Sequence, residues 1–267
     1  MKTIQTKAGK RVIFAMIMLL ASAVILCGCI SKTESPASEV ANTEKIAEVK
    51  TEIAINATNF PDPGFRAHVA AEIDKNKDGI LAPEEAAEIK ELYLAKAGIS
   101  SLQGIEFFAA LETLDCSNNQ LAALDISKNT KLVQLQCFEN QLTGLDVKNN
   151  TMLKTFYCFS NQLTVLDVSK NTSLTVLNCS HNRLTELDIS NNTNLKWLDC
   201  YYNQLTKLDI SNNTQLKSLY CYYNQLTELD VSNNINLTHL YCANNLITEL
   251  DISKNTKLEE YDWKNSD

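Results

Sequence analysis

The sequence predicts an α/β solenoid with a parallel sheet on its concave face and tight turns or 3-10 segments on its convex face. Three observations support this prediction. From Leu114 onward the chain repeats every 21 residues without a slip, in seven consecutive units and a closing half unit. Each unit contains a short alternation of apolar and polar residues, as at 135–137, which is typical of a strand with one buried face. All four prolines lie at or before Pro83, so none interrupts the repeats.

The apolar positions of one unit define one rung of the solenoid. In the rung that contains residues 135–137, we expect Leu132, Leu142, Leu145 and Val147 to fill the rest of the interior. A single unit cannot bury its apolar face alone, so stability must come from stacking of neighbouring rungs. A looser unit of 22 residues begins at Leu92, which places the start of the solenoid there.

The repeated pattern L-x-x-L-x-C-x-x-N-x-L resembles the leucine-rich repeat, with cysteine in place of its third leucine. A 21-residue version with that replacement is similar to the repeats of the listerial internalins, especially the member known for a cysteine ladder. The resemblance covers residues 92–267. It implies a right-handed solenoid with the parallel sheet on the concave face, and it suggests protein binding without naming a ligand.

Seven cysteines recur at the third position of the strand pattern and should stack on the inward face. Disulfides are one reading, because the chain is expected outside the cytoplasm. The odd number and the parallel direction of equivalent side chains disfavour bridging, and a straight line of thiols does not converge on a metal. We therefore predict buried free thiols that act as small hydrophobes. The set is Cys116, Cys137, Cys158, Cys179, Cys200, Cys221 and Cys242.

Two polar columns accompany the cysteines. An asparagine follows each strand, and its amide can donate and accept, so a stacked column can satisfy the backbone of the bend. A column of aspartates precedes each convex turn and is expected to cap its amides; cation binding is the alternative. The asparagines are Asn119, Asn140, Asn161, Asn182, Asn203, Asn224 and Asn245, and the aspartates are Asp125, Asp146, Asp167, Asp188, Asp209, Asp230 and Asp251.

Aromatic residues gather at positions that should face solvent on the concave surface. Seven of the nine tyrosines fall there. A contiguous aromatic patch is costly unless a partner covers it, so we predict a ligand-binding face, although strand propensity alone is the alternative. The predicted binding residues are Phe138, Tyr157, Phe159, Trp197, Tyr201, Tyr202, Tyr220, Tyr222, Tyr223 and Tyr241, accompanied by Gln136, Asn178, His181 and His239.

The N-terminus reads as a targeting segment. Basic residues up to Arg11 precede an apolar run, 12–26, that is short for a membrane span. The run ends in Leu26-Cys27-Gly28-Cys29, which resembles a bacterial lipobox and implies cleavage after Gly28 and lipid attachment (palmitate among the acyl chains) at Cys29. An ordinary secretory signal or a single membrane anchor are the alternatives. Residues 29–50 then form a flexible tether, so we expect an extracytoplasmic, lipid-anchored bacterial surface protein.

Residues 51–91 are predicted to form a helical cap on the repeats. Asp62 and Pro63 are a helix start, and Phe65, Val69 and Ile73 share one face. The following loop resembles an EF-hand, with oxygen ligands expected from Asp74, Asn76, Asp78, Glu85 and the carbonyl of Ile80. This resemblance implies weak Ca²⁺ binding; the alternative is a metal-free cap. At the other end, Tyr261 and Trp263 could cover the open core.

Charge and motifs exclude several functions. The net charge of −8 includes four basic residues of the targeting segment, so the mature surface is more acidic still and disfavours nucleic acid. Only three histidines occur, and the sequence contains no phosphate-binding loop or nucleophile elbow, so we expect that the protein is not an enzyme. The sequence thus predicts domains at 1–28, 29–50, 51–91 and 92–267, and a binding function. The expected partner is a protein of the envelope or host, with glycan binding or a purely structural envelope role as alternatives.

Overall fold

A computed structural model describes residues 51–264 of the 267-residue chain. The predicted signal peptide 1–28, the predicted lipid-bearing Cys29 and the tether 29–50 lie outside the described residues. All described residues belong to one compact unit. In this range, no helix is both long and apolar enough to cross a membrane.

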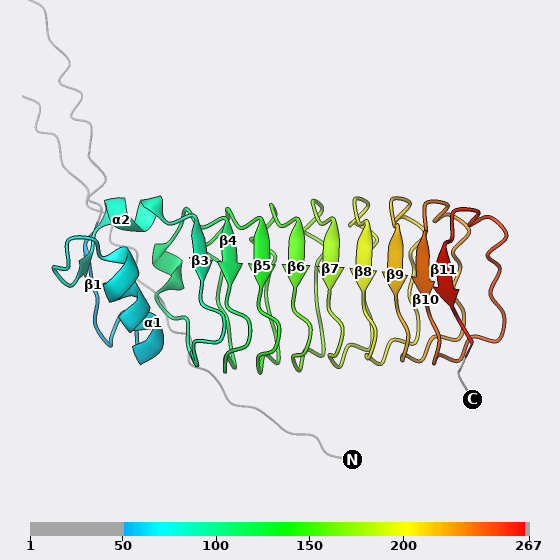
Figure 1. The fold of residues 1–267 in the computed structure, drawn as a ribbon, viewed down its shortest axis with the longest axis horizontal. Helices are drawn as coiled ribbons and strands as arrows, with labels where there is room; N and C mark the ends of the chain where they lie inside the picture. Colours follow the sequence, from blue (N-terminus) through cyan, green and yellow to red (C-terminus); the bar gives the residue numbers. More distant parts are fainter. Residues whose placement is uncertain (1–50, 265–267) are drawn as a thin grey trace, which may run out of the picture. The chain divides into compact units, whose positions relative to one another are not determined.

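Nine short parallel strands make the central sheet (Figure 1). They follow one another in chain order, so each strand pairs with the strand of the next repeat. Their bounds are β3 Glu91–Tyr93, β4 Thr113–Asp115, β5 Gln134–Gln136, β6 Thr155–Tyr157, β7 Val176–Asn178, β8 Trp197–Asp199, β9 Ser218–Tyr220, β10 His239–Tyr241 and β11 Glu260–Asp262. The predicted solenoid of stacked repeats is thereby confirmed.

The register of the sheet keeps equivalent residues of successive repeats in line. Leu135 pairs with Leu114 on one side and with Phe156 on the other. The central residue of each strand from β4 to β10 is fully buried, whereas its two neighbours point to the opposite face. The ladder continues past the strands, since the Cys137 N–H donates to the Tyr157 carbonyl at 2.9 Å. The 21-residue period therefore becomes straight columns of identical side chains.

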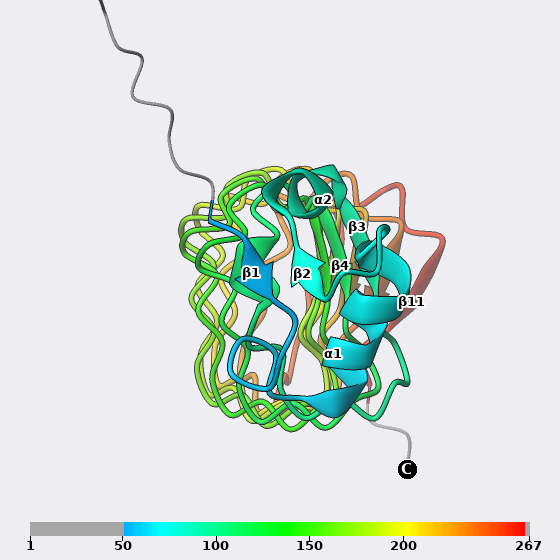
Figure 2. The same ribbon diagram turned by 90° about the vertical axis from the view of Figure 1, so that its left-hand side faces the viewer.

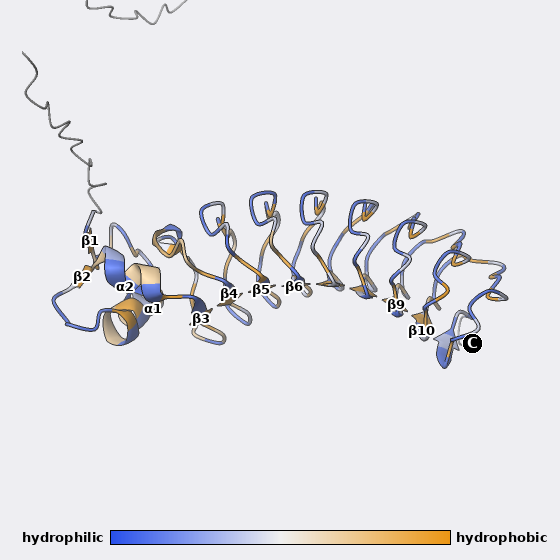
Figure 3. Ribbon diagram, turned by 90° about the horizontal axis from the view of Figure 1, so that it is seen from above, coloured by the Kyte–Doolittle hydropathy of each residue, from blue (hydrophilic) through white to orange (hydrophobic). Residues whose placement is uncertain are grey.

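The strands line the inner side of a gentle curve, and the return segments lie on its outer side (Figure 3). The return segments are tight turns, with one 3-10 helix at Ile105–Phe107 within the described residues. Leu132, Leu142 and Val147 are fully buried in their rung as expected, while Leu145 is only partly buried. The interior between strands and turns is thus one continuous apolar core.

The N-terminal unit contains β1 (Ile53–Ala54), α1 (Pro63–His68), a π-helical turn (Val69–Ile73), β2 (Ile80–Leu81) and α2 (Pro83–Glu88). These elements cluster at one end of the solenoid (Figure 2). The predicted helix start is confirmed, because Asp62 Oδ1 accepts the Phe65 N–H at 3.0 Å. Phe65, Val69 and Ile73 are all buried.

Aromatic packing joins this unit to the first repeats. Phe65 lies between Phe60 and Phe108, with ring centroids 5.6 and 6.4 Å away. Asp62 also accepts hydrogen bonds from the backbone and hydroxyl of Ser100. Gly104, with φ of +104°, lets the chain pass against the Phe60 ring. The unit therefore closes the first rung from outside.

The opposite end is only partly covered. Trp263 packs against the core, but Tyr261 is 53% exposed. The expectation that both rings would cover the open core is therefore right for Trp263 alone. Tyr261 stands at the leucine position of β11, and no described strand follows to bury it.

Candidate binding face

We define the strand face as the outward residues of β4 to β11 together with the two residues after each ladder cysteine. The second of those two residues has a positive φ of 50–55° in every full repeat, for instance at Tyr202 and Tyr223. This left-handed turn bends the chain after the strand while keeping its side chain on the same face. All ten aromatic residues predicted to bind a ligand lie on the strand face.

The rings of the strand face stack in columns along the solenoid. Equivalent residues of neighbouring repeats are held one strand spacing apart, which is close to the distance that stacked rings prefer. Tyr201 and Tyr222 stack with centroids 4.4 Å apart, and Tyr202 and Tyr223 do the same in the next column. Further stacked pairs are Phe138–Phe159 at 4.3 Å, His181–Tyr202 at 4.5 Å, Tyr220–Tyr241 at 5.1 Å and Trp197–Tyr220 at 5.6 Å.

Stacking leaves the rings edge-on to solvent. Trp197, Tyr202 and Tyr223 are between 43% and 44% exposed, whereas Tyr201 and Tyr222 are half-buried between their neighbours. Side-chain direction agrees with the sequence prediction, since the rings point out and the cysteines point in. Stacking of the rings on one another was not foreseen. The role of these residues in binding stays a prediction.

Asp199 lies among the densest part of this aromatic surface. Its Oδ1 accepts the indole N–H of Trp197 at 2.7 Å, and its Oδ2 accepts the amide of Asn178 at 2.9 Å. Burial raises the pKa of Asp199 to about 6, and the hydrogen bond from Trp197 only partly opposes this effect. The pKa of Tyr220 is raised by burial and by the nearby Asp199. Sequence analysis missed Asp199, although it interrupts a run of aromatic residues.

The seven ladder cysteines are all free and fully buried. Their thiols line the core directly behind the strand face. Burial raises the pKa of the Cys179 thiol to about 12, so it stays protonated and unreactive at neutral pH. The cysteines therefore act as small apolar residues, and the prediction of buried free thiols is confirmed.

The asparagine column that follows the strands forms the expected hydrogen bonds. Asn140 Oδ1 accepts the Leu121 N–H at 3.0 Å, and its Nδ2 donates to the carbonyls of Cys116 and Cys137. Each amide thus connects neighbouring rungs and satisfies backbone groups of the bend.

A second asparagine column on the convex side was missed. Its members donate to carbonyls of the preceding rung, but every Oδ1 is buried without a hydrogen-bond partner. These are Asn129, Asn150, Asn171, Asn192, Asn213, Asn234 and Asn255. The Asn-Thr pair that recurs in six of the seven repeats was the signal that could have revealed them.

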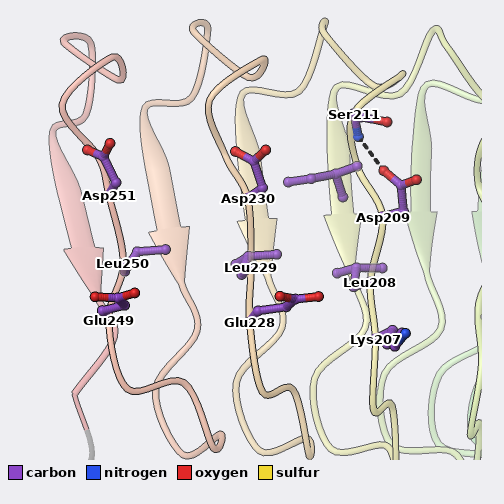
Figure 4. A pocket seen from close by; sticks show the side chains of 11 residues that line it. Lys207, Leu208, Asp209, Ser211, Glu228, Leu229, Asp230, Glu249, Leu250 and Asp251 are labelled. Carbon is purple, nitrogen blue, oxygen red and sulfur yellow. Dashed lines mark hydrogen bonds between the residues drawn. The ribbon is translucent and has the colours of Figure 1, made fainter.

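The aspartate column caps the convex turns as predicted. Asp209 Oδ1 accepts the Ser211 N–H at 2.9 Å, and hydrogen bonds to Ser211 lower the pKa of Asp209. The column forms one rim of a groove whose floor is a row of leucines (Figure 4). The other rim carries Glu228 and Glu249, in line with Lys207. Because each aspartate of the column already caps a convex turn by accepting a backbone N–H, we assign the groove no ligand.

The predicted EF-hand-like loop joins the π-helical turn to α2. Asp74 is buried, and its Oδ2 accepts the Gly79 N–H at 2.9 Å while its Oδ1 has no partner. Glu85 reaches back over the loop and accepts the N–H groups of Lys75 and Ala82. Its bond to Ala82 satisfies the N–H of the N-cap residue of α2, whereas the alanine side chain accepts no N–H of the first turn. Asn76 and Asp78 are exposed and bonded to each other.

The loop has the oxygen chemistry that calcium prefers, but its carboxylates do not converge. Among residues 51–264, no three histidine, cysteine or acidic side chains are arranged to hold a metal ion. Both carboxylate oxygens of Glu85 already accept hydrogen bonds from backbone N–H groups. The one buried side-chain oxygen or nitrogen of this loop that lacks a partner is Asp74 Oδ1. Ca²⁺ binding stays a prediction, favoured by that buried oxygen.

The parallel ladder, the inward leucines and the asparagine columns together define a leucine-rich-repeat solenoid. A model of leucine-rich repeats (2 copies) matches residues 193–234. Internalin J of Listeria monocytogenes serotype 4b is 36% identical over 71 residues, which is 27% of this chain and 8% of that protein. The repeats of this chain are thus similar to those of internalin J.

A solved structure has the same fold. Internalin C2 of Listeria monocytogenes aligns with a TM-score of 0.74 and 22% identity over 79% of this chain and 97% of that one. A domain of InlJ from Listeria monocytogenes that includes a cysteine ladder is 33% identical, with a TM-score of 0.49, over 79% of this chain and 56% of that one. The chain therefore spans little more than half of that domain's length.

Proposed function

We propose that the protein acts by binding rather than by catalysis, and that its strand face recognises another protein. Extended inner surfaces of solenoids are suited to binding macromolecules, and tyrosine and tryptophan are frequent in protein interfaces. The observation that carries the proposal is the stacking of the rings on one another, with Tyr201 on Tyr222 and Tyr202 on Tyr223.

Mutual stacking favours a protein over a glycan. A sugar packs on an open aromatic face, but the faces of the inner rings here are covered by their neighbours at about 4.4 Å. Among these inner rings, what remains accessible is a ridged surface of ring edges and phenol hydroxyls. Such a surface offers apolar area and hydrogen bonds together, as protein interfaces do.

The test uses the triple variant Trp197→Ala, Tyr201→Ala and Tyr222→Ala. Its matched control removes three exposed apolar side chains elsewhere in the repeats, Met152, Val165 and Ile235, also by substitution with alanine. Partners are captured from envelope and host extracts, purified and titrated against each form, and all forms are applied in parallel to a glycan array.

A purified protein that binds the wild type and the control equally, and the aromatic variant at least about a hundredfold more weakly, supports the proposal. Equal binding by the aromatic variant contradicts it. Glycan binding that depends on the same rings would replace the protein partner by a sugar.

We further propose that the protein is held on the outer face of a bacterial membrane by a lipid on Cys29. The Leu26-Cys27-Gly28-Cys29 sequence supports this proposal. Incorporation of labelled palmitate into the wild type but not into the Cys29→Ser variant, together with release of that variant from the membrane fraction, is the expected result. Equal labelling of the two forms would contradict lipid attachment at this residue.

Weak Ca²⁺ binding at the 74–85 loop is a second candidate function, proposed because Asp74 Oδ1 is buried without a partner. Asp74, Asn76, Asp78, Glu85 and the Ile80 carbonyl would hold the ion, after Glu85 gives up its bonds to the backbone. The ion would supply the positive charge that the buried carboxylate lacks.

Calorimetry tests the calcium proposal. A dissociation constant of about 1 mM would raise the free energy of unfolding by roughly 1.4 kcal/mol in 10 mM Ca²⁺. The heat of binding should vanish in the Asp74→Ala variant and persist in Glu72→Gln, which alters an exposed carboxylate just before the loop. The same heat in Asp74→Ala would exclude this loop as the site.

A further inference from the structure

The charge of the strand face is one-sided. The outward positions of β4 to β11 carry four carboxylates and no lysine or arginine. The carboxylates are Asp115, Asp199, Glu260 and Asp262. Asp199 stands apart because it lies within the aromatic part of the face, in register between Asn178 of β7 and Tyr220 of β9.

Asp199 has no cationic partner among the described residues. Both of its hydrogen bonds come from neutral donors, the Trp197 indole and the Asn178 amide. A carboxylate has room for about four hydrogen bonds, so each oxygen can accept one more. Half-burial without a compensating positive charge also raises the pKa of Asp199 to about 6. The charged form of this group is therefore undersatisfied in the free protein.

One face of the Trp197 indole has no ring of the described residues stacked on it. Tyr220 is the sole ring among residues 51–264 that stacks on the Trp197 indole, at 5.6 Å. On its other side the neighbouring outward residue is Val176 of β7, which is not aromatic. Trp197 is 43% exposed, and its N–H is fixed on Asp199 Oδ1. The flat π-surface of the Trp197 indole and the Asp199 carboxylate are thus adjacent.

A planar cation matches both features. A guanidinium group stacks on an indole face and donates parallel hydrogen bonds to a carboxylate, whereas an ammonium group does not make both contacts in the same way. We propose that Asp199 and the face of Trp197 that carries no stacked ring form a subsite for an arginine side chain of the protein partner. This inference rests on the proposed protein-binding function and specifies the residue that the centre of the strand face receives.

The two tryptophans allow a direct test by NMR. The indole N–H resonance of Trp197 reports on Asp199, and that of Trp263, which lies at the last rung, serves as an internal control. The probes are the N-acetyl methylamides of arginine, of its neutral analogue citrulline, and of lysine. The variants are Asp199→Asn and the charge-matched control Asp262→Asn, which alters an exposed carboxylate of the same column.

With the arginine probe, the Trp197 resonance should shift and saturate while that of Trp263 stays unchanged. Binding should be at least about tenfold weaker for citrulline and for the Asp199→Asn variant, and unchanged in Asp262→Asn. Equal binding of citrulline, binding of lysine as tight as that of arginine, or no loss in Asp199→Asn would overturn the assignment. Each of these results would leave the aromatic-dependent capture of a partner intact, so the subsite and the proposed function can fail separately.

Discussion

The two asparagine columns make a quantitative prediction, because their members use the amide group differently. Asn182 belongs to the column after the strands, and its Oδ1 accepts the Leu163 N–H at 2.9 Å. Asn192 belongs to the convex column, and its Oδ1 has no partner. Both side chains are buried in the same repeat, so substitution by alanine deletes the same atoms and opens the same volume in each case.

The backbone groups left behind decide the difference. In Asn182→Ala the Leu163 N–H, buried in the core, loses the one partner that the described residues give it. In Asn192→Ala no group is orphaned, since the carbonyls of Val168 and Asn171 keep their backbone donors at 3.0 and 3.1 Å. A buried unsatisfied N–H costs about 1–3 kcal/mol. Asn182→Ala should therefore lower the free energy of unfolding by about 1–3 kcal/mol more than Asn192→Ala.

Equilibrium unfolding in urea, followed by circular dichroism, measures the two free energies. The dependence on urea must have the same slope in all forms for the comparison to hold. The exposed neighbour Asn191→Ala is the control and should change the free energy of unfolding by less than about 0.5 kcal/mol. If Asn182→Ala and Asn192→Ala are equally destabilising, or Asn192→Ala is the worse, the reasoning from unsatisfied backbone groups is refuted.

Three further predictions concern other parts of the molecule. Because the pKa of Asp199 is raised to about 6, the folded protein binds a proton between about pH 4 and about pH 6 that the unfolded chain does not bind. The free energy of unfolding should therefore rise as pH falls from about 6 to about 4, by no more than about 3 kcal/mol. Urea titrations should show this rise in the wild type and not in Asp199→Asn, and parallel curves for the two forms would contradict it. Titration with a thiol reagent should find the seven ladder cysteines unreactive in the native protein and all seven reactive after denaturation, and reaction of any one under native conditions would contradict their burial. Gly104→Ala would place a Cβ 2.4 Å from the Phe60 ring at a φ of +104°, and it should lower the free energy of unfolding by more than about 2 kcal/mol. Gly144→Ala, with open space around the new Cβ, should be neutral or slightly stabilising. Comparable melting temperatures of the two variants would refute the packing argument.

Much of the candidate site was predictable because a strict repeat converts sequence position into direction. Once the alternation at 135–137 was recognised as typical of a strand, the outward direction of Tyr201 and the inward direction of Cys200 followed from the alternation of side chains along a strand. The aspartate caps followed from the turn residues after them. No such rule predicts how outward side chains pack against one another, so the sequence did not reveal that the rings stack or that Asp199 lacks a cationic partner.

The sequence by itself determined the solenoid, its rungs and the face of each residue, since these depend on periodicity and hydrophobic burial, which are properties of one repeat applied many times. Only the tertiary structure decided which rings stack on one another, which buried amide oxygens go unpaired, and how the N-terminal unit packs on the first rung through Phe60, Phe65 and Phe108. Most of those features depend on distances of a few ångströms between residues that are 21 to 43 positions apart, as in Tyr201–Tyr222 and Phe65–Phe108, and such distances exist only after the rungs have stacked.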